Sequence, residues 1–330
     1  MSRFDVSIVI PTYNRAERLL KAVRSCSQDG ISVEVIVVDD GSSDNTDSML
    51  REAFPQDDGS RDDLAHSTMS LKILKQQRSG PAAARNLGLR NASADLVKFL
   101  DSDDELIRGA LIQEVEHARA TGADAVVTGW EERAGTELLR APSAPDLSRG
   151  IDDMLQGKAP WTAAGLYRRA FIKDLEWLAA DGKADDWGWA WTVCLAGARF
   201  ARLEINSAIW VEHDSDRITT TGDSFQKSTD ARQAILARVE TALAETGRLT
   251  PERRHLLARY YCKDAKVICS RSRAEWTALW KHCCELAPGF VPKDSDRLTT
   301  VLSRWTGHYR AVIIYTSMRR LARSLGLRRH

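Results

Sequence analysis

Short runs rich in β-branched residues alternate with helical patterns along the first 130 residues, and this alternation restricts the fold more than any other feature of the chain. Strand-like runs separated by amphipathic helices are typical of βαβ units with a mostly parallel sheet. We therefore predict an α/β fold. The expected strands are Val6–Ile10, Val33–Val38, Leu71–Leu74, Leu96–Leu100 and Ala125–Val127, and the expected helices are Glu17–Ser27, one from about Thr46, Ala82–Leu89 and Arg108–Thr121.

Beyond residue 130 the pattern loosens. A segment rich in Pro, Ala and Ser, Arg140–Ser148, is predicted to be a linker. A tryptophan-rich helix is expected over Asp186–Leu195, followed by strands near Phe200–Leu203 and Ile209–Glu212. Helical periodicity dominates from Ser224 onward, which predicts a helical C-terminal region packed against the α/β domain.

Charged residues are balanced over the whole chain but not along it. Lys and Arg number 47 against 46 Asp and Glu, which excludes a strongly basic nucleic-acid binder. After Asp296 there are eight arginines and no acidic residue, so the first 296 residues carry a net charge of about −7. The final segment, Tyr309–His330, mixes apolar residues with arginines. Such a helix either lies at an anionic membrane surface or packs on the helical region.

The compartment is expected to be the cytoplasm. No apolar run reaches the roughly 18 to 20 residues that cross a bilayer, and the first strand-like run is too short for the core of a signal peptide. The six cysteines include no CxxC pair, which argues against a zinc site and favours free thiols in a reducing compartment. If the basic tail binds lipid, the protein would be peripheral at the inner face of the membrane.

Three segments place polar residues directly after expected strands, where open α/β sheets bind their ligands. They are IVIPTYNR (Ile8–Arg15), VIVVDDGSSDNT (Val35–Thr46) and VKFLDSDDEL (Val97–Leu106). The third gathers Asp101, Asp103 and Asp104. Three adjacent carboxylates repel one another unless a cation is bound, and their hard oxygen atoms suit Mg²⁺ or Mn²⁺. A divalent cation can in turn neutralise a diphosphate leaving group.

Together with GPAAARNLGL (Gly80–Leu89) and ADDW (Ala184–Trp187), these segments resemble, in order, the family 2 glycosyltransferases of the GT-A fold. The resemblance spans about the first 220 residues. Its specificity lies in the ordered combination, since a lone DxD is common in loops. It implies a Rossmann-like, mostly parallel sheet with flanking helices. The expected parts are a nucleotide-sugar-binding subdomain (1–130), an acceptor-binding part of the same domain (131–223) and a helical domain with a basic tail (224–330).

The resemblance also implies roles for individual residues in donor and metal binding. Thr12 and Asp40 would line the pocket for the nucleotide base, and Arg85 would lie near the base or the diphosphate. Asp101 would face the ribose or the metal, and Asp103 would bind Mn²⁺ or Mg²⁺ directly.

Neighbouring residues have more than one interpretation. Asp104 either contacts the ion or supports its loop, and Asp39 either joins the site or stabilises the turn through an Asx-type hydrogen bond. Asn14 and Arg15 are expected only to support the residues that touch the donor.

A second chemical requirement is a base. Transfer with inversion needs a carboxylate that removes the proton of the acceptor hydroxyl. In the family this group is the second acid of a Glu-Asp pair that opens a helix, and the matching residues here are Asp185 and Asp186, with Asp in place of the usual Glu. Asp186 is therefore the expected catalytic base, while Asp185 and Trp187 are expected to contact the acceptor. Alternatively, both carboxylates only cap the helix.

Further candidates are weaker. The same resemblance implies that His213, which follows an expected strand, is a metal or diphosphate ligand and that Arg217 holds phosphate, although a lone His is more often an ordinary core or surface residue. Several tryptophans crowd the expected acceptor region, where indole faces can stack on sugar rings. At least two of them are expected in the core, because Trp187 and Trp191 share one helix face. The set is Trp161, Trp187, Trp189 and Trp191.

We therefore predict an inverting glycosyltransferase that moves a hexosyl or N-acetylhexosaminyl group from a nucleotide sugar, expected to be a UDP-sugar, to a glycan or lipid-linked acceptor, as in polysaccharide or cell-surface glycan synthesis. One alternative is a sugar-phosphate nucleotidyltransferase, but the segment after the first strand lacks a glycine-rich phosphate loop. A dehydrogenase is disfavoured because GxGxxG is missing. Another alternative is a non-catalytic sugar-binding protein, against which Asp101, Asp103 and Asp186 argue together.

Overall fold

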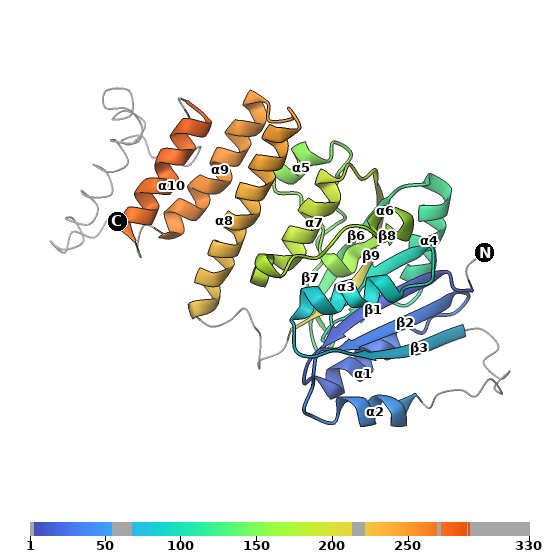
Figure 1. Cartoon of the computed structure of the whole chain (residues 1–330). Coiled ribbons are helices and arrows are strands. Elements are labelled where there is room, and N and C mark those ends of the chain that lie inside the picture. Colours follow the sequence, from blue (N-terminus) through green and yellow to red (C-terminus); the bar gives the residue numbers. More distant parts are fainter. Residues whose placement is uncertain (1–2, 55–67, 213–221, 269–271, 289, 291–330) are drawn as a thin grey trace. The chain divides into compact units, whose positions relative to one another are not determined.

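The computed structural model describes residues 3–54, 68–212, 222–268, 272–288 and 290, which fall into two compact units, 1–232 and 233–330 (Figure 1). The border expected at residue 130 lies inside strand β6, and the one expected at 223 lies inside helix α8. The strands of unit 1 are β1 (Val6–Thr12), β2 (Ser32–Asp39), β3 (Thr68–Lys75), β4 (Leu96–Phe99), β5 (Glu105–Leu106), β6 (Ala125–Ala134), β7 (Glu137–Arg140), β8 (Gly165–Arg168) and β9 (Phe200–Val211).

The helices are interspersed with these strands, as the alternating pattern predicts. Those of unit 1 are α1 (Ala16–Ser25), α2 (Thr46–Ala53), α3 (Pro81–Asn91), α4 (Ala110–Thr121), α5 (Ile151–Leu155), the 3-10 turn η1 (Thr162–Ala164), α6 (Arg169–Ile172), η2 (Ala179–Ala184) and α7 (Asp185–Leu195). Helix α8 (Gly222–Glu245) crosses the division between the units, and α9 (Pro251–Ile268) and α10 (Arg273–Leu286) belong to unit 2.

The nine strands that the structure describes in unit 1 form one sheet in the order β3-β2-β1-β4-β8-β6-β9-β5, with β7 paired to β6 outside this path. Strands β3, β2, β1 and β4 run parallel to one another, β6 and β9 are also parallel, and β8 is antiparallel to both β4 and β6. The expected α/β fold with a mostly parallel sheet and flanking helices is therefore confirmed. The parallel half brings the carboxyl ends of β2, β1 and β4 side by side.

Helices cover both faces of this sheet, which explains why β1 is buried along its whole length. Ile8 and Ile10 point to one face and pack with Leu19 of α1 and Leu111 of α4. Val9 points to the opposite face, where it joins a second cluster. That cluster also contains Ala82, Ala84 and Leu89 of α3, Phe99 of β4 and the buried aromatic side chains Tyr167, Trp177 and Trp189. The alternation of side chains along one strand thus builds two hydrophobic cores.

Two local predictions need correction. The two strands expected at 200–203 and 209–212 are one strand, β9, because its polar middle residues pair with β6 through register shifts around Gly129. The expected linker at 140–148 packs on unit 1 instead of joining separate parts. Its residues Ala144 and Leu147 are buried, and the carbonyl of Pro142 accepts the N–H of Trp130 at 3.2 Å. The short strands β5, β7 and β8 were not expected.

Gly88 lets α3 approach β1 closely, since a Cβ atom there would lie 2.2 Å from Cγ1 of Val9. We expect Gly88→Ala to lower the free energy of unfolding by about 1–3 kcal/mol, as overpacking does, despite the helix propensity of alanine, which favours it by about 1 kcal/mol. Urea unfolding measures this, with Arg90→Ala on the exposed side of α3 as control. Wild-type stability in Gly88→Ala would contradict the close contact.

Unit 2 consists, in its described part, of the end of α8 together with α9 and α10, as the helical periodicity predicted. Its buried residues include Leu257, Tyr261, Trp276 and Trp280. Ser272 caps α10 by accepting the N–H of Glu275. The basic tail falls among residues 291–330 and so lies outside the described residues. The described helices include none with the length and apolar character that a bilayer span requires.

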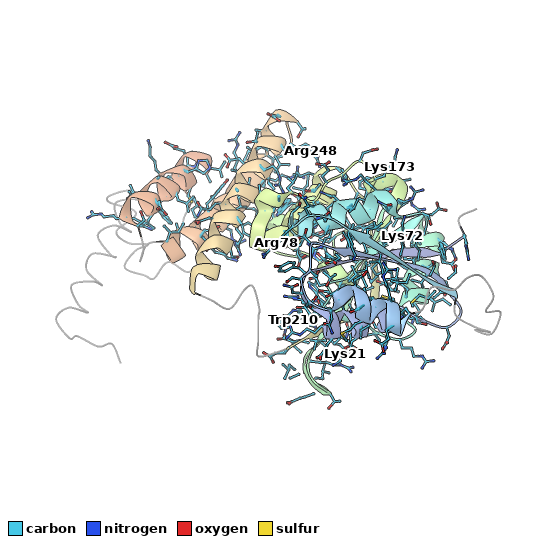
Figure 2. All side chains as sticks on the ribbon, turned by 60° about the horizontal axis from the view of Figure 1, so that its bottom comes forward. Lys21, Lys72, Arg78, Lys173, Trp210 and Arg248 are labelled. Atoms are coloured by element: carbon cyan, nitrogen blue, oxygen red, sulfur yellow. The ribbon has the colours of Figure 1, made fainter. Side chains whose placement is uncertain are left out.

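Exposed basic side chains of unit 1 are distributed over several elements. Lys21 on α1, Lys72 on β3 and Lys173 just after α6 are all exposed (Figure 2). The described cysteines are free, as expected.

Candidate active site

The expected site residues of the first strands meet at one edge of the sheet. Strands β2, β1 and β4 are neighbours and parallel, so Thr12 at the end of β1 lies at the same sheet edge as Asp40 and Asp101, which follow β2 and β4. The backbone N–H of Asp40 donates to the carbonyl of Thr12 at 2.9 Å. The Thr12 side chain is buried, and its hydroxyl makes no hydrogen bond within the described part of the chain. A buried hydroxyl of this kind can accept a ligand as its partner.

Asp40 holds the loop that leads into α3. Its carboxylate accepts hydrogen bonds from Gln76 Nε2 at 2.7 Å and from the backbone N–H groups of Ser79 and Gly80 at 2.7 and 2.8 Å. Asp39 instead accepts the N–H of Ser42 at 2.9 Å, which is the Asx-type turn considered from the sequence. Asp40 therefore shapes the edge of the site and is only 5% exposed.

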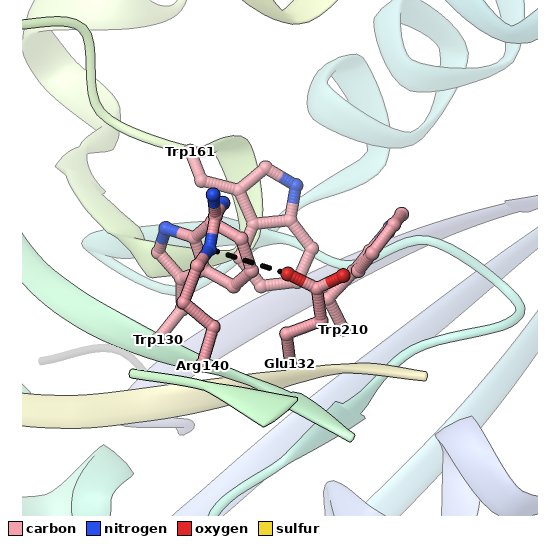
Figure 3. Close-up of a pocket in the computed structure, with 5 residues that line it drawn as sticks. All are labelled: Trp130, Glu132, Arg140, Trp161 and Trp210. Carbon is pink, nitrogen blue, oxygen red and sulfur yellow. Dashed lines mark ion pairs between the residues drawn. The ribbon is translucent and has the colours of Figure 1, made fainter. Parts of the chain in front are cut away.

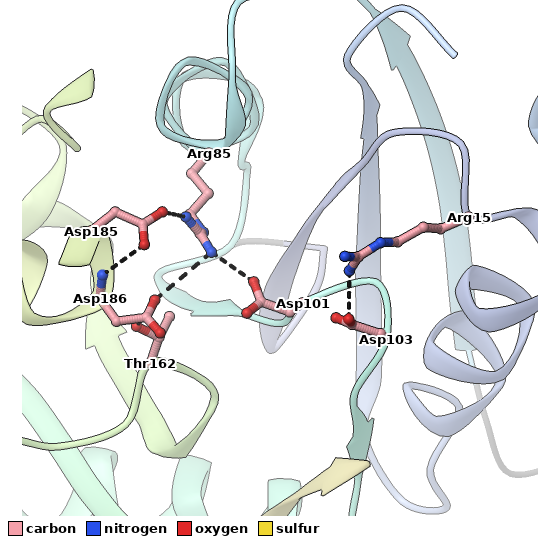
Figure 4. A network of polar contacts seen from close by, with 7 residues as sticks. All are labelled: Arg15, Arg85, Asp101, Asp103, Thr162, Asp185 and Asp186. Carbon is pink, nitrogen blue, oxygen red and sulfur yellow. Dashed lines mark hydrogen bonds and ion pairs between the residues drawn. The ribbon is translucent and has the colours of Figure 1, made fainter. Parts of the chain in front are cut away.

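Arg85 connects the two halves of the site (Figure 4). Its guanidinium reaches Asp101 and Asp185 at 2.6 Å each, and Asp186 lies at 3.8 Å. The side chain is 4% exposed and stacks over the ring of Trp177 at 4.3 Å. Burial opposes its charge, but the three carboxylates outweigh this and raise the pKa of Arg85. Arg85 thus brings together residues that lie 100 positions apart in the chain.

The acidic loop after β4 gathers Asp101, Asp103 and Asp104, each with a carboxylate oxygen within 4.8 Å of the others. Asp103 pairs with Arg15 through its Oδ2 at 2.5 Å. Asp104 is buried and accepts the backbone N–H of Val211 at 3.2 Å. The last contact supports the loop, one of the two roles considered for Asp104.

The electrostatics of this loop fit a divalent cation. Burial and then the neighbouring carboxylates, chiefly Asp103 and Asp185, raise the pKa of Asp101 against the pull of Arg85. Burial together with Asp101 and Asp103 raises the pKa of Asp104 well above its usual value. Carboxylates here outnumber the guanidinium groups of Arg15 and Arg85. The carboxylate oxygens lie close together, and nearby positive groups do not balance their negative charge. Mg²⁺ and Mn²⁺ prefer oxygen ligands of this kind.

Asp186 lies in the first turn of α7, at the opposite side of Arg85 from the acidic loop (Figure 4). The hydroxyl of Thr162 donates to its Oδ1 at 2.8 Å. Burial, followed by the charges of Asp185 and Asp101, raises the pKa of Asp186 to about 7. The side chain still exposes 36% of its surface, so a substrate hydroxyl can reach it. A reachable carboxylate with a pKa near neutrality has the properties of a general base.

Asp185 contacts both the backbone of α7 and Arg85. It accepts the N–H of Asp186 at 3.1 Å through Oδ1, and its Oδ2 accepts from Arg85. The Asp185 carboxylate thus contacts the backbone of the first turn of α7, whereas the Asp186 carboxylate contacts Thr162 and Arg85.

The four tryptophans differ in burial. Trp189 and Trp191 are buried, which confirms that at least two of the four are core residues. Trp187 is half-buried, with its ring 6.0 Å from that of Trp191 and beneath the guanidinium of Arg232. Trp161 is half-buried too. His213 and Arg217 lie outside the described residues.

Two contributors were not anticipated in their observed roles. Arg15 pairs directly with Asp103 across 88 positions, and Thr162 orients Asp186. Arg15 belongs to the segment IVIPTYNR that the sequence analysis singled out, whereas Thr162 lies in none of the motifs. As a whole, the site can hold a cation at the sheet edge and accept a proton at the start of α7.

A family model described as glycosyl transferase family 2 matches residues 7–174. The GalNAc(5)-diNAcBac-PP-undecaprenol beta-1,3-glucosyltransferase of Campylobacter jejuni is 38% identical over 107 residues, or 32% of this chain and 32% of that protein. The succinoglycan biosynthesis protein ExoO of Rhizobium meliloti is 36% identical over 124 residues, or 37% of this chain and 32% of that protein. The chain thus spans about a third of the length of these curated relatives.

Solved structures share the fold over most of the chain. The crystal structure of S. aureus TarS 1-349 in complex with UDP-GlcNAc superposes with a TM-score of 0.65 at 17% identity, covering 94% of this chain and 91% of that one. The mannosyltransferase PcManGT from Pyrobaculum calidifontis, in complex with GDP-Man and Mn²⁺, gives a TM-score of 0.51 at 20% identity and covers 94% and 85%. At these identities the likeness concerns the fold.

Proposed function

The chain belongs to glycosyl transferase family 2, and from this premise we propose that it transfers a sugar, with inversion, from a nucleoside diphosphate sugar to a hydroxyl group of a glycan or lipid-linked acceptor. One observation carries the proposal. Arg85 joins Asp101 of the acidic loop to the carboxylate pair that opens α7, so a cation site and a base lie on two sides of one guanidinium. The family match also argues against the alternative that the protein is a sugar-phosphate nucleotidyltransferase.

The donor is proposed to lie along the carboxyl ends of β1, β2 and β4. The unpaired hydroxyl of Thr12 and the edge shaped by Asp40 would receive the nucleotide, and Arg85 would lie beside the diphosphate. Asp101 and Asp103 would hold Mn²⁺ or Mg²⁺, which neutralises the departing diphosphate when bound. His213 and Arg217 remain proposed contacts on the sequence alone. We propose a UDP-sugar as donor, as expected from the sequence; the TarS structure contains UDP-GlcNAc and the PcManGT structure contains GDP-Man, so a screen has to include both nucleotides.

The acceptor is proposed to approach Asp186 from the exposed side of α7. Asp186 takes the proton of the acceptor hydroxyl as that oxygen attacks the anomeric carbon from the face opposite the diphosphate. The hydrogen bond from Thr162 orients the Asp186 carboxylate. Burial, followed by the negative charge of Asp185, raises the pKa of Asp186 and so makes its carboxylate a stronger base. Asp185 and Trp187 would contact the acceptor sugar beside it.

A screen of nucleotide sugars tests the proposal. With Mn²⁺ or Mg²⁺ present, we expect nucleoside diphosphate release from at least one UDP-sugar, faster when a glycan acceptor is added. Absence of release from every UDP-, GDP- and dTDP-sugar would overturn it. We propose that the acceptor belongs to polysaccharide or cell-surface glycan synthesis, as the names of the two relatives suggest. A lipid-linked acceptor would agree with a cytoplasmic protein peripheral at an anionic membrane.

Activity should depend on pH through Asp186. Its raised pKa means that the base is protonated in acid, so kcat/KM is expected to fall as the pH drops below about 7. Solvent reaches 36% of the Asp186 side chain, which reduces the rise in its pKa. The acidic limb of the pH profile of kcat/KM should therefore lie at about pH 7 or slightly below. Asp185→Asn removes a neighbouring negative charge and should move the limb to lower pH. A pH profile of kcat/KM for both proteins measures this. An unmoved limb in Asp185→Asn would assign the titration to another group.

A further inference from the structure

A pocket of about 390 Å³ opens on unit 1 outside the carboxylate site and is walled by three indole rings (Figure 3). It is lined by Trp130, Glu132, Arg140, Trp161 and Trp210, and we call it the tryptophan pocket. Its volume lies in the range of small-molecule sites. All three tryptophans are half-buried, so their rings are partly open to solvent. Of its five lining residues, only Trp161 has a role above, as a candidate for stacking on an acceptor sugar.

The sheet itself builds the pocket. Trp130 and Glu132 are two positions apart on β6 and therefore point to the same face. Trp210 of β9 lies directly opposite Glu132, and Arg140 of β7 lies opposite it on the other side. Trp161 closes the pocket from the segment before η1, with its ring centre 5.2 Å from that of Trp130. Hydrogen-bonded strands thus fix four of the five side chains, which makes the pocket preformed.

The chemistry of the walls selects the ligand. Indole faces bind the apolar C–H face of a pyranose ring through burial and electrostatic attraction. Glu132 and Arg140 form an ion pair at 3.2 Å, and Arg140 also lies over the ring of Trp130 at 5.0 Å. One carboxylate and one guanidinium leave the lining without net charge, which does not favour a phosphate. Both groups can still hydrogen-bond hydroxyls at the edge of a ring. An uncharged sugar ring can stack on the indole faces and also hydrogen-bond Glu132 and Arg140.

Two short chain connections place the pocket beside the site. Trp161 immediately precedes Thr162, whose hydroxyl bonds Asp186. Trp210 immediately precedes Val211, whose N–H bonds Asp104 of the acidic loop. We propose that the tryptophan pocket binds a pyranose ring of the acceptor glycan, the ring next to the one whose hydroxyl is glycosylated. The inference rests on the proposed function and adds that the acceptor is an oligosaccharide held by at least two of its rings.

Binding can be measured without turnover. Saturation-transfer NMR with methyl glycosides of glucose, galactose and N-acetylglucosamine, and with the disaccharides methyl cellobioside and methyl lactoside, should show contact of at least one ligand with wild-type protein. Trp130→Ala is expected to weaken that binding by about tenfold, the effect of losing one stacked aromatic wall. Trp130→Phe keeps a flat wall and should retain most of it. Leu139→Ala, exposed on β7 and outside the lining, is the matched control.

Two outcomes of the binding measurements would overturn the inference. One is unchanged glycoside binding in both Trp130→Ala and Trp210→Ala; the second variant guards against local misfolding of the first, and thermal unfolding verifies both. The other is a pocket that takes up farnesol, a polyisoprenoid chain, but no glycoside. That result would make it a lipid-chain site.

Kinetics separate this inference from the proposed function. In a wild-type enzyme that releases nucleoside diphosphate, a disaccharide acceptor should exceed its terminal monosaccharide in kcat/KM by about tenfold or more. Trp130→Ala should abolish that advantage while leaving donor hydrolysis in the absence of acceptor unchanged. Wild-type turnover without any disaccharide advantage would refute the pocket assignment alone. Absence of nucleoside diphosphate release would refute the proposed function, whereas glycoside binding sensitive to Trp130 would still support a sugar site.

Discussion

Asp186→Asn is expected to reduce sugar transfer by about 10²- to 10⁴-fold, the usual contribution of a general base, while the affinity for the nucleotide sugar stays the same. The asparagine side chain is the same size and can still accept the hydrogen bond from Thr162. It cannot remove a proton from the acceptor hydroxyl. Single-turnover transfer and equilibrium binding of the donor separate the two effects. Asp174→Asn, on an exposed side chain of the same unit, is the matched control.

The same variant should also be more stable than the wild type in mild alkali. Because the folded protein raises the pKa of Asp186 above its value in the unfolded chain, ionisation of Asp186 penalises folding as the pH rises from about 4 to about 7. Asparagine does not ionise and removes this penalty, so its thermal midpoint should exceed that of the wild type at pH 8 but not at pH 4. A variant that loses both transfer and stability would indicate that Asp186 is only structural.

Asp103→Asn is expected to lower both nucleoside diphosphate release and transfer by about 10²-fold or more, because a cation held there provides several kcal/mol of charge stabilisation. The loss should be partly restored by higher Mn²⁺ concentrations, since Asp101 still offers an oxygen ligand. Full activity in Asp103→Asn, or turnover that does not depend on metal, would show that the acidic loop has another role.

Arg15 provides the matched variant for this experiment. Its guanidinium pairs with the Asp103 carboxylate and so competes with a cation for the same oxygen. Arg15→Gln should therefore lower the Mn²⁺ concentration needed for half-saturation, whereas Asp103→Asn should raise it. Electron paramagnetic resonance of free Mn²⁺ measures both shifts without substrate. Shifts in the same direction would contradict direct competition at Asp103.

Much of the fold could be predicted because buried parallel strands carry a local signal. The β-branched runs of β1 and β2 have that signal, and the polar residues after them mark the ligand-binding edge. Strands β5 and β8 have two and four residues, and their pairing with β9, β4 and β6 defines them rather than their own composition. Short antiparallel strands of this kind depend on tertiary contacts that no local pattern encodes.

The candidate site was predictable where it lies in motifs and not where it depends on long-range pairs. Asp103 and Asp186 stand in segments whose order alone points to a donor and a base. Arg85 and Asp185 pair although they are 100 positions apart in the sequence, and Thr162 bonds Asp186 across 24 positions. The tryptophan pocket depends on the register of β6 with β7 and β9, so tryptophans at 130, 161 and 210 give no periodic signal in the sequence.

The most direct test of the central claim is the configuration of the first product. Proton NMR can follow the anomeric signals while the protein consumes an α-linked UDP-sugar with Mn²⁺, with a glycan acceptor or with water in its place. The account predicts that UDP appears together with a sugar in the β configuration, before mutarotation scrambles any free sugar. Product formed first in the α configuration, or an α-linked donor left intact, would contradict inverting transfer by Asp186.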